Sequence, residues 1–181
     1  MSGRFNALAD RLDGIAVAAG RIAGWAAVVM VIVIMFDVIT RRFLVLGSTK
    51  LQDLEWHLHA ILFLMTLGFA YARGGHVRID VVHARLSPRS QAWIELIGTV
   101  TLLIPFCLVV LWYGADFIER SFAMNESSST QTGLPYRWII KSFLFSGFTM
   151  LLIAALGSAA RQIATLRGEI SASPIPESTA P

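Results

Sequence analysis

Four long apolar blocks constrain this 181-residue chain more than any other feature. They run from 17 to 39, 54 to 72, 92 to 115 and 138 to 160. A helix of about 20 residues crosses the roughly 30 Å hydrocarbon layer of a bilayer, so each block is long enough to span it. With 55% hydrophobic and 15% charged residues, the composition is too apolar for an ordinary soluble domain. The sequence predicts an all-α integral membrane protein with four transmembrane helices.

Polar segments flank this membrane domain of residues 17–160. Residues 1–16 form an N-terminal arm of mixed charge, which does not fit a cleavable signal. Residues 161–181 form a tail whose Pro, Ser and Glu content is typical of disorder. The two flanks, the connection 73–91 and the start of the first block carry nine arginines, against six basic residues elsewhere. Because basic residues favour the cytoplasmic side, we expect both termini in the cytoplasm.

Charge and cysteine content narrow the classes of function further. A net charge of +3 gives little reason to expect nucleic acid as a partner. The single cysteine, Cys107, lies inside the third block, which favours a small buried side chain and excludes an intramolecular disulfide.

Local signals indicate where the helices begin and bend. Ser87 is placed to cap the third helix, with Pro88 at its first position. Pro105 removes a backbone hydrogen bond inside that helix and predicts a kink. Pro135 is expected to start the fourth helix, followed by an interfacial anchor of Tyr136, Arg137 and Trp138.

The first two blocks carry polar and small residues at helical spacing. Asp37 and Arg41 are four residues apart, a spacing that predicts an ion pair. Gly20 and Gly24 form a GxxxG pattern that indicates a close helix contact. The second block is the least apolar, because Glu55 begins it and two histidines, His57 and His59, follow.

The connection 73–91, here called the inner loop, gathers most of the remaining reactive side chains. They are His76, Arg78, Asp80, His83 and Arg85. If the loop is helical from Arg78, then Ile79, Val82 and Leu86 form one apolar stripe, which predicts an amphipathic interfacial segment. An extended segment remains open, because apolar residues also alternate from Val77 to Val81.

Three functions that require a ligand-binding site were compared with a purely structural role: haem binding, zinc binding and transport by the chain alone. Haem ligation needs histidines at facing depths, yet the four histidines are split between one helix and the inner loop. Zinc held by His76, Asp80 and His83 would lack an apparent fourth ligand and would face arginines. A stand-alone carrier would use Glu55 or Glu95 as an embedded carboxylate, but both lie at span ends, where a partner or a headgroup can satisfy them. We therefore expect no enzyme activity, no cofactor and no metal.

The order of three segments resembles a known family, the small membrane subunit (DctQ family) of tripartite ATP-independent periplasmic (TRAP) transporters. The first is FDVITRRFLVLGSTKLQDLEWHLHAILFLMTLGFAYA, in which Glu55 opens the second helix. The second is GGHVRIDVVHARLSP, similar to an HVRVD-type inner loop, and the third is GLPYRWIIKSFLFSGFTMLL. The resemblance covers about residues 20 to 160.

This resemblance implies a scaffold role in a bacterial inner membrane. In this family a periplasmic binding protein delivers an organic anion, often a carboxylate, to a membrane complex. The large subunit carries the substrate and sodium sites, and the small subunit supports its stationary part. The expected partners are therefore the large membrane subunit, the binding protein and the lipid bilayer.

No catalytic residue is expected on this chain, and the candidate residues are structural. We expect Arg78 and Asp80 to form an ion pair, and Glu55 to anchor the second helix through Lys50 or Arg42. The full set of candidates for the subunit interface is Glu55, Trp56, His76, Arg78, Ile79, Asp80, Val82, Leu86, Pro135, Arg137, Trp138 and Lys141.

Overall fold

The computed structural model describes residues 4–44, 47–75, 86–128 and 132–168, and every regular element in these ranges is helical. The elements are α1 (Arg4–Phe43), α2 (Thr49–Ala72), α4 (Pro88–Gly98), the π-helical turn η1 (Thr99–Leu103), α5 (Ile104–Ala123) and α6 (Trp138–Leu166). Helix α4, η1 and α5 form one continuous helix of 36 residues. The prediction of an all-α protein is confirmed for the described residues.

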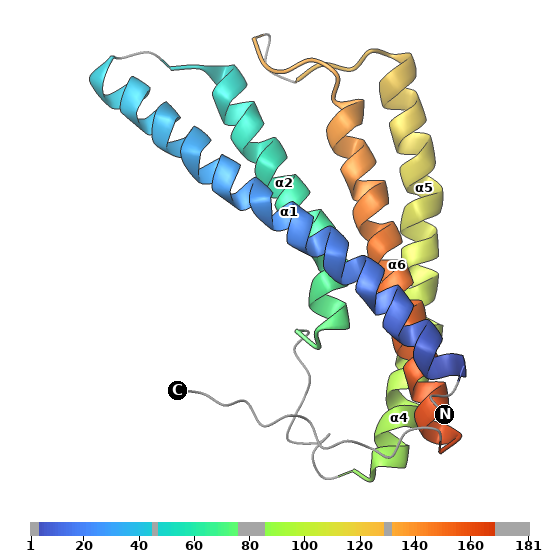
Figure 1. Ribbon diagram of the computed structural model, residues 1–181. Helices are drawn as coiled ribbons and strands as arrows, with labels where there is room; N and C mark the ends of the chain where they lie inside the picture. Colours follow the sequence, from blue (N-terminus) through green and yellow to red (C-terminus); the bar gives the residue numbers. More distant parts are fainter. Residues whose placement is uncertain (1–3, 45–46, 76–85, 129–131, 169–181) are drawn as a thin grey trace, which may run out of the picture.

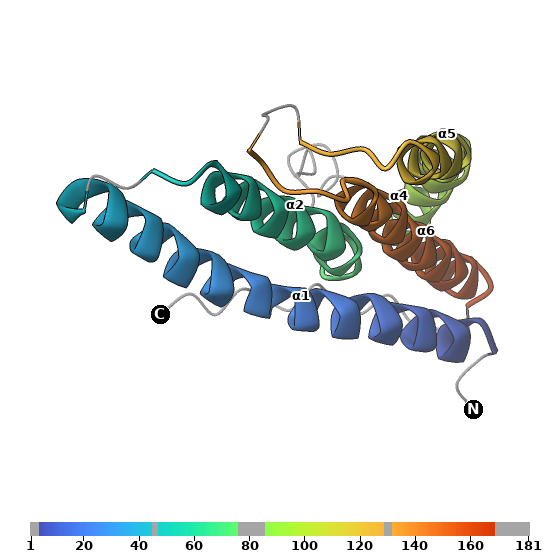
Figure 2. The ribbon, with the colours of Figure 1, turned by 90° about the horizontal axis from the view of Figure 1, so that it is seen from above.

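Helix α6 lies at the centre of the bundle and contacts α1, α2, α4 and α5. Figure 1 shows two helix pairs, α1 with α2 and α5 with α6, that diverge towards the end where each pair is connected. We call this the connection end, and the opposite end, where α1 starts and α6 finishes, the terminal end. Seen from above, α2 and α6 form a middle layer between α1 and α5 (Figure 2).

Glycines allow the central helices to approach closely. A Cβ atom added to Gly68 of α2 would lie 2.6 Å from the Met150 carbonyl oxygen of α6. One added to Gly147 of α6 would lie 2.6 Å from the Leu64 carbonyl oxygen of α2. Because real Cβ atoms do not come so near a backbone oxygen, these two positions fix the α2–α6 spacing, as small residues do in membrane bundles.

Only the first glycine of the GxxxG pattern on α1 packs closely against another described helix. Gly20 packs against the Phe69 side chain of α2, whereas a Cβ atom on Gly24 would meet nothing within 4 Å. The predicted close helix contact therefore involves Gly20 and α2.

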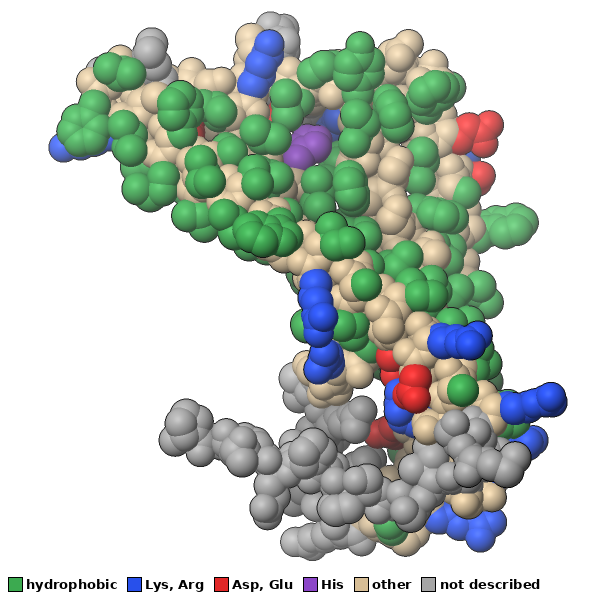
Figure 3. Space-filling view, viewed as in Figure 1, with side chains coloured by type: hydrophobic (Ala, Val, Ile, Leu, Met, Phe, Trp, Pro, Cys, Tyr) green, Lys and Arg blue, Asp and Glu red, His purple; other side chains and the backbone are tan. Residues whose placement is uncertain are grey.

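Three helices are long and apolar enough to cross a membrane: α1, the α4–α5 helix and α6. Their large apolar side chains lie mainly outside, and the core consists mostly of small residues such as Ala16, Cys107 and Ala154. Figure 3 shows apolar side chains covering most of one face, with charged side chains gathered mainly near its ends. Such an inside-out distribution is expected for a protein whose solvent is lipid.

Helix α2 is not among these three, because Glu55, His57 and His59 lower the hydropathy of its first half. Its 24 residues nevertheless correspond to about 36 Å at 1.5 Å per residue. The fourth predicted span therefore has sufficient length, and its passage through the bilayer stays a prediction.

The helices extend beyond the predicted membrane domain at both of its ends. Helix α1 begins at Arg4, so most of the predicted arm belongs to the first helix. Helix α6 continues to Leu166, so the predicted tail begins as helix, and residues 169–181 lie outside the described part. Hydropathy does not indicate where α1 begins or where α6 ends, because charged residues such as Arg and Glu extend a helix as readily as apolar ones.

The third helix starts as predicted, and its proline produces a π-helical turn. The Ser87 hydroxyl accepts a hydrogen bond from the Ser90 amide at 3.2 Å, and Pro88 occupies the first turn. The π-helical turn η1 ends two residues before Pro105, and the kink predicted at this proline stays a prediction. A proline ring collides with the carbonyl four residues earlier, here Thr101, and a wider turn relieves that contact.

Candidate functional site

The connection 124–137 binds the start of α2 at the connection end. The Thr49 hydroxyl donates a hydrogen bond to the Thr132 carbonyl at 3.1 Å, and the two threonine hydroxyls are 2.7 Å apart. Asp53 Oδ2 accepts a hydrogen bond from the Leu134 amide at 2.9 Å. These contacts bridge the gap between the two diverging helix pairs that Figure 1 shows.

Asp53 is held as a carboxylate by this connection. The Ser128 hydroxyl and then the Leu134 amide hydrogen-bond to it and lower the pKa of its carboxyl, helped by the charges of His57 and Arg137. Gly133 makes the approach possible, since a Cβ atom there would collide with Asp53 Oδ2 and with Ser128.

Lys141 joins the connection 124–137 to both α5 and α6. Its ammonium donates a hydrogen bond to Glu126 Oε2 and lies 3.7 Å from the centre of the Phe117 ring, in cation–π geometry. The lysine side chain is 12% exposed. Its hydrogen bond is the main reason why the pKa of Glu126 lies below its usual range. Lys141 thus connects the loop, α5 and α6 at this end of the bundle.

The segment 135–138 differs from the prediction in the position at which the last helix begins. Tyr136 has a positive φ of 62°, and α6 begins at Trp138, so Pro135 precedes the helix instead of starting it. The Arg137 amide donates to the Glu126 carbonyl at 2.9 Å, which turns the chain into α6. The Trp138 ring packs edge-on against Phe122, with centroids 5.5 Å apart.

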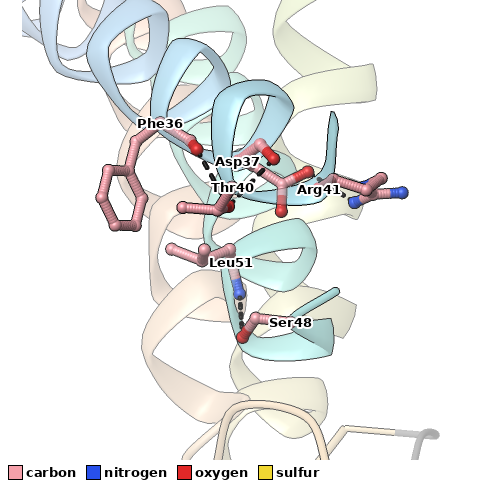
Figure 4. Close-up of polar contacts among 6 residues, drawn as sticks. All are labelled: Phe36, Asp37, Thr40, Arg41, Ser48 and Leu51. Carbon is pink, nitrogen blue, oxygen red and sulfur yellow. Dashed lines mark hydrogen bonds and ion pairs between the residues drawn. The ribbon is translucent and has the colours of Figure 1, made fainter. Parts of the chain in front are cut away.

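The polar residues of α1 and α2 also meet at the connection end. Asp37 and Arg41 form the predicted ion pair at 2.5 Å. When the side-chain amide of Gln52 is oriented with its oxygen towards Arg41, this oxygen accepts two hydrogen bonds from the guanidinium, at 2.7 and 2.9 Å. Figure 4 shows Asp37 and Arg41 above the first turn of α2, close to Ser48 and Leu51.

Glu55 and Trp56 lie on different sides of α2. Trp56 is 73% exposed, as a lipid-facing or partner-facing residue would be. Glu55 is half-buried, and among the described residues it forms no ion pair with Lys50 or Arg42. The expected anchoring through those two side chains therefore has no support in the described contacts.

Five of the candidates in the inner loop lie outside the described residues: His76, Arg78, Ile79, Asp80 and Val82. Leu86, at the end of the loop, is described and half-buried, and its carbonyl accepts a hydrogen bond from Gln91 Nε2 at 3.2 Å. The expected ion pair between Arg78 and Asp80 and the apolar stripe remain predictions.

The contacts at the terminal end were not predicted from the sequence. Arg161 of α6 pairs with Asp13 of α1 and lies 3.3 Å from Asp10. Gln162 Nε2 donates a hydrogen bond to Glu95 Oε2 at 2.6 Å. These pairs join residues that are distant in sequence, and only the acidic and basic residues at the helix ends could have indicated them.

Described histidines do not form a ligand set. His57 Nδ1 lies 2.5 Å from the Asp53 carbonyl, and His59 is exposed, two residues away on a regular helix. Groups of three or more metal-ligating side chains do not occur within ranges 4–44, 47–75, 86–128 and 132–168. The described arrangement is a set of structural junctions between helices, concentrated at the two ends of the bundle.

Comparison with known proteins agrees with this architecture. The family described as "Tripartite ATP-independent periplasmic transporters, DctQ component" matches residues 30–165. No curated protein matches the sequence. The matched range contains the connection end, the inner loop and nearly all of α6, and it covers well over half of the chain. The chain therefore belongs to the DctQ family, the small permease component of TRAP transporters.

Proposed function

We propose that this chain is a scaffold subunit that supports the large membrane subunit of a TRAP transporter. In this proposal the complex takes up an organic anion, such as a carboxylate, with sodium, and a periplasmic binding protein delivers it. In this proposal the large subunit, and not this chain, carries the substrate site. Family membership is the observation that carries the proposal.

The architecture supports a stationary role in the bilayer. Helix α6 contacts every other described helix, and ionic contacts tie it to the bundle at both of its ends. Outward-facing apolar side chains lie on α1 and on α5, which gives the bundle two broad surfaces for lipid or for the larger subunit. We propose that four helices cross the bacterial inner membrane, with both termini in the cytoplasm.

Co-purification and uptake test this function together. The full chain is co-expressed with a tagged large subunit and with the binding protein in cells that lack all three genes. Uptake of the anion that the binding protein retains is expected to require the chain, and the chain should elute with the tagged subunit. Uptake by the chain alone, or undiminished uptake without it, would contradict the scaffold role.

A further inference from the structure

The exposed residues of α2 beyond its first turn form a single stripe. They are Gln52, Trp56, His59 and Phe63, and we call them the α2 stripe. Their spacing of four, three and four residues places them on one face of a helix. Helix α2 packs against α1 and α6, and none of its residues from 64 to 72 is exposed. The stripe is therefore the side of α2 that the described residues leave uncovered, in the half nearer the connection end.

Lipid is a poor neighbour for this stripe when α2 crosses the bilayer as proposed. His59 lies five residues inside the predicted span 54–72, which is about 7–8 Å along the helix axis. Its imidazole ring is exposed and has no hydrogen-bond partner among the described residues. Ionisable side chains within transmembrane segments almost always face protein or a water-filled cavity, because hydrocarbon offers them no hydrogen bond. Position 59 therefore indicates a face that protein covers.

The outward faces of α1 and α5 have the opposite character. Every exposed residue of α1 from Ile22 to Ile39 is apolar. On α5 the exposed residues from Phe106 to Ala115 are apolar apart from the hydroxyl group of Tyr113. An exposed imidazole or charge occurs on neither of these two surfaces, so hydrocarbon chains can solvate both of them.

Two large aromatic side chains flank His59 about one turn away in each direction. Trp56 precedes it by three residues and Phe63 follows it by four, and both are largely exposed. Tryptophan is among the residues that contribute most to protein interfaces, and transmembrane helices associate through close packing and through hydrogen bonds of side chains such as histidine. The partner that fits this surface is a transmembrane helix with small residues opposite the two rings and a hydrogen-bonding side chain opposite the imidazole.

We propose that a transmembrane helix of the large subunit packs on the α2 stripe, and that the outward faces of α1 and α5 meet lipid. The identity of this partner rests on the proposed function. The rest of α2 holds the stripe in place, since Asp53 binds the Leu134 amide near one end of the helix and Gly68 lies against the Met150 backbone near the other. A surface fixed in this way loses little conformational freedom when a partner binds.

Photo-crosslinking in the intact complex tests which surface meets the large subunit. The photoreactive residue p-benzoylphenylalanine replaces Phe63 of the stripe, which is 60% exposed, or the matched Phe36 of α1 and Phe106 of α5, which are 57% and 55% exposed. Each variant is co-expressed with a tagged large subunit and irradiated in membranes. We expect a crosslink to the large subunit from position 63 and none from positions 36 and 106. An equally strong crosslink from position 36 or 106, or a product of position 63 with lipid or a second copy of this chain only, would overturn the proposal.

Co-purification in detergent gives a second readout, normalised to the amount of each variant that is present in the membrane. Trp56→Ala should lower the amount of retained large subunit several-fold, whereas Trp112→Ala, on the equally exposed tryptophan of α5, should leave it unchanged. His59→Leu should also lower retention several-fold, and His59→Gln, which keeps a hydrogen-bonding side chain, should retain most of it. Retention by Trp56→Ala and His59→Leu at the level of wild type would count against the stripe as the docking surface.

The unsubstituted chain distinguishes a failure of this inference from a failure of the proposed function. If wild type does not co-purify with the large subunit, the scaffold role itself is wrong. If wild type co-purifies and supports uptake but position 63 gives no crosslink to the large subunit, the scaffold role stands and only the assignment of the docking surface to α2 is wrong.

Discussion

Lys141 and Gly133 show how single residues determine the geometry of the connection end. Lys141 satisfies Glu126 and covers the Phe117 ring, while Gly133 leaves room for the Asp53 carboxylate. Neither role could be derived from the sequence, because each depends on a neighbour that is distant along the chain. The resemblance singled out the segment that contains both residues, but it gave no reason for either of them.

Glu126 should make the stability of the chain depend on acid. Its pKa is lowered in the folded state, so it stabilises the fold above its ordinary pKa, and this contribution is lost as the pH falls through the folded value. We expect the Tm of wild type to fall below about pH 4, and that of Glu126→Gln to fall less steeply. Melting curves across the acid range measure this, with exposed Glu119→Gln as control. If the Tm of Glu126→Gln fell with pH as steeply as that of Glu119→Gln, the stabilising contact between Lys141 and Glu126 would be contradicted.

Gly133→Ala should open the junction between α2 and the connection 124–137. The added Cβ atom would collide with Asp53 Oδ2 and Ser128, so one of the hydrogen bonds to Asp53 must break. We expect a loss of about 1–3 kcal/mol in the free energy of unfolding. Gly47→Ala, where the added atom meets nothing within 4 Å, is the matched control. Similar losses in the two variants would show that space at position 133 is not the cause.

At the scale of elements, local signals predicted what lies within one helix. Ser87 and Pro88 start α4, and Asp37 pairs with Arg41, because cap and i, i+4 interactions depend only on nearby residues. The predicted start of α6 at Pro135 was wrong, since the Glu126 carbonyl and the left-handed Tyr136 delay the helix to Trp138. Tertiary contacts decided that boundary.

The contact between α2 and α6 should not tolerate a larger residue at position 147. Gly147→Leu would force the helices apart, because the Leu64 backbone lies where the new side chain must go. We expect a loss of about 3 kcal/mol or more, or failure to fold. The control Gly24→Leu faces open space on α1 and should leave stability nearly unchanged. Thermal unfolding of both variants in detergent decides the matter, and a stable Gly147→Leu would refute the close packing.

For the whole molecule, the course of α2 decides on which side of the membrane each connection lies. In a Cys107→Ser background, Gly47→Cys and Ser127→Cys should react with an impermeant maleimide added outside spheroplasts. Arg89→Cys and Ser173→Cys should react only after permeabilisation, because four crossings place them on the cytoplasmic side. Labelling of Arg89→Cys from outside would exclude a spanning α2.

The inner loop is predicted to dock on the inner end of the large subunit or on anionic lipid headgroups. Replacing Arg78 and Asp80 with alanine should reduce co-purification of the large subunit several-fold, because the docking segment would lose its internal ion pair. Pull-down and uptake by the same cells measure the effect. Alanine at exposed Glu119 and Arg120 serves as control, since these residues lie at the other end of the bundle. Unchanged assembly with unchanged uptake would contradict the prediction.

The π-helical turn η1 also acts as a one-residue insertion in a repeating pattern. The buried positions of the long third helix are Ala92, Thr99, Cys107, Gly114 and Ser121. Successive members are seven residues apart except across η1, where the step is eight. A seven-residue step from Thr99 would have placed the large side chain of Phe106, which is 55% exposed, at the buried position that Cys107 occupies. The extra residue shifts the phase of everything after it, so that small side chains continue to meet α6 along the full length of the helix.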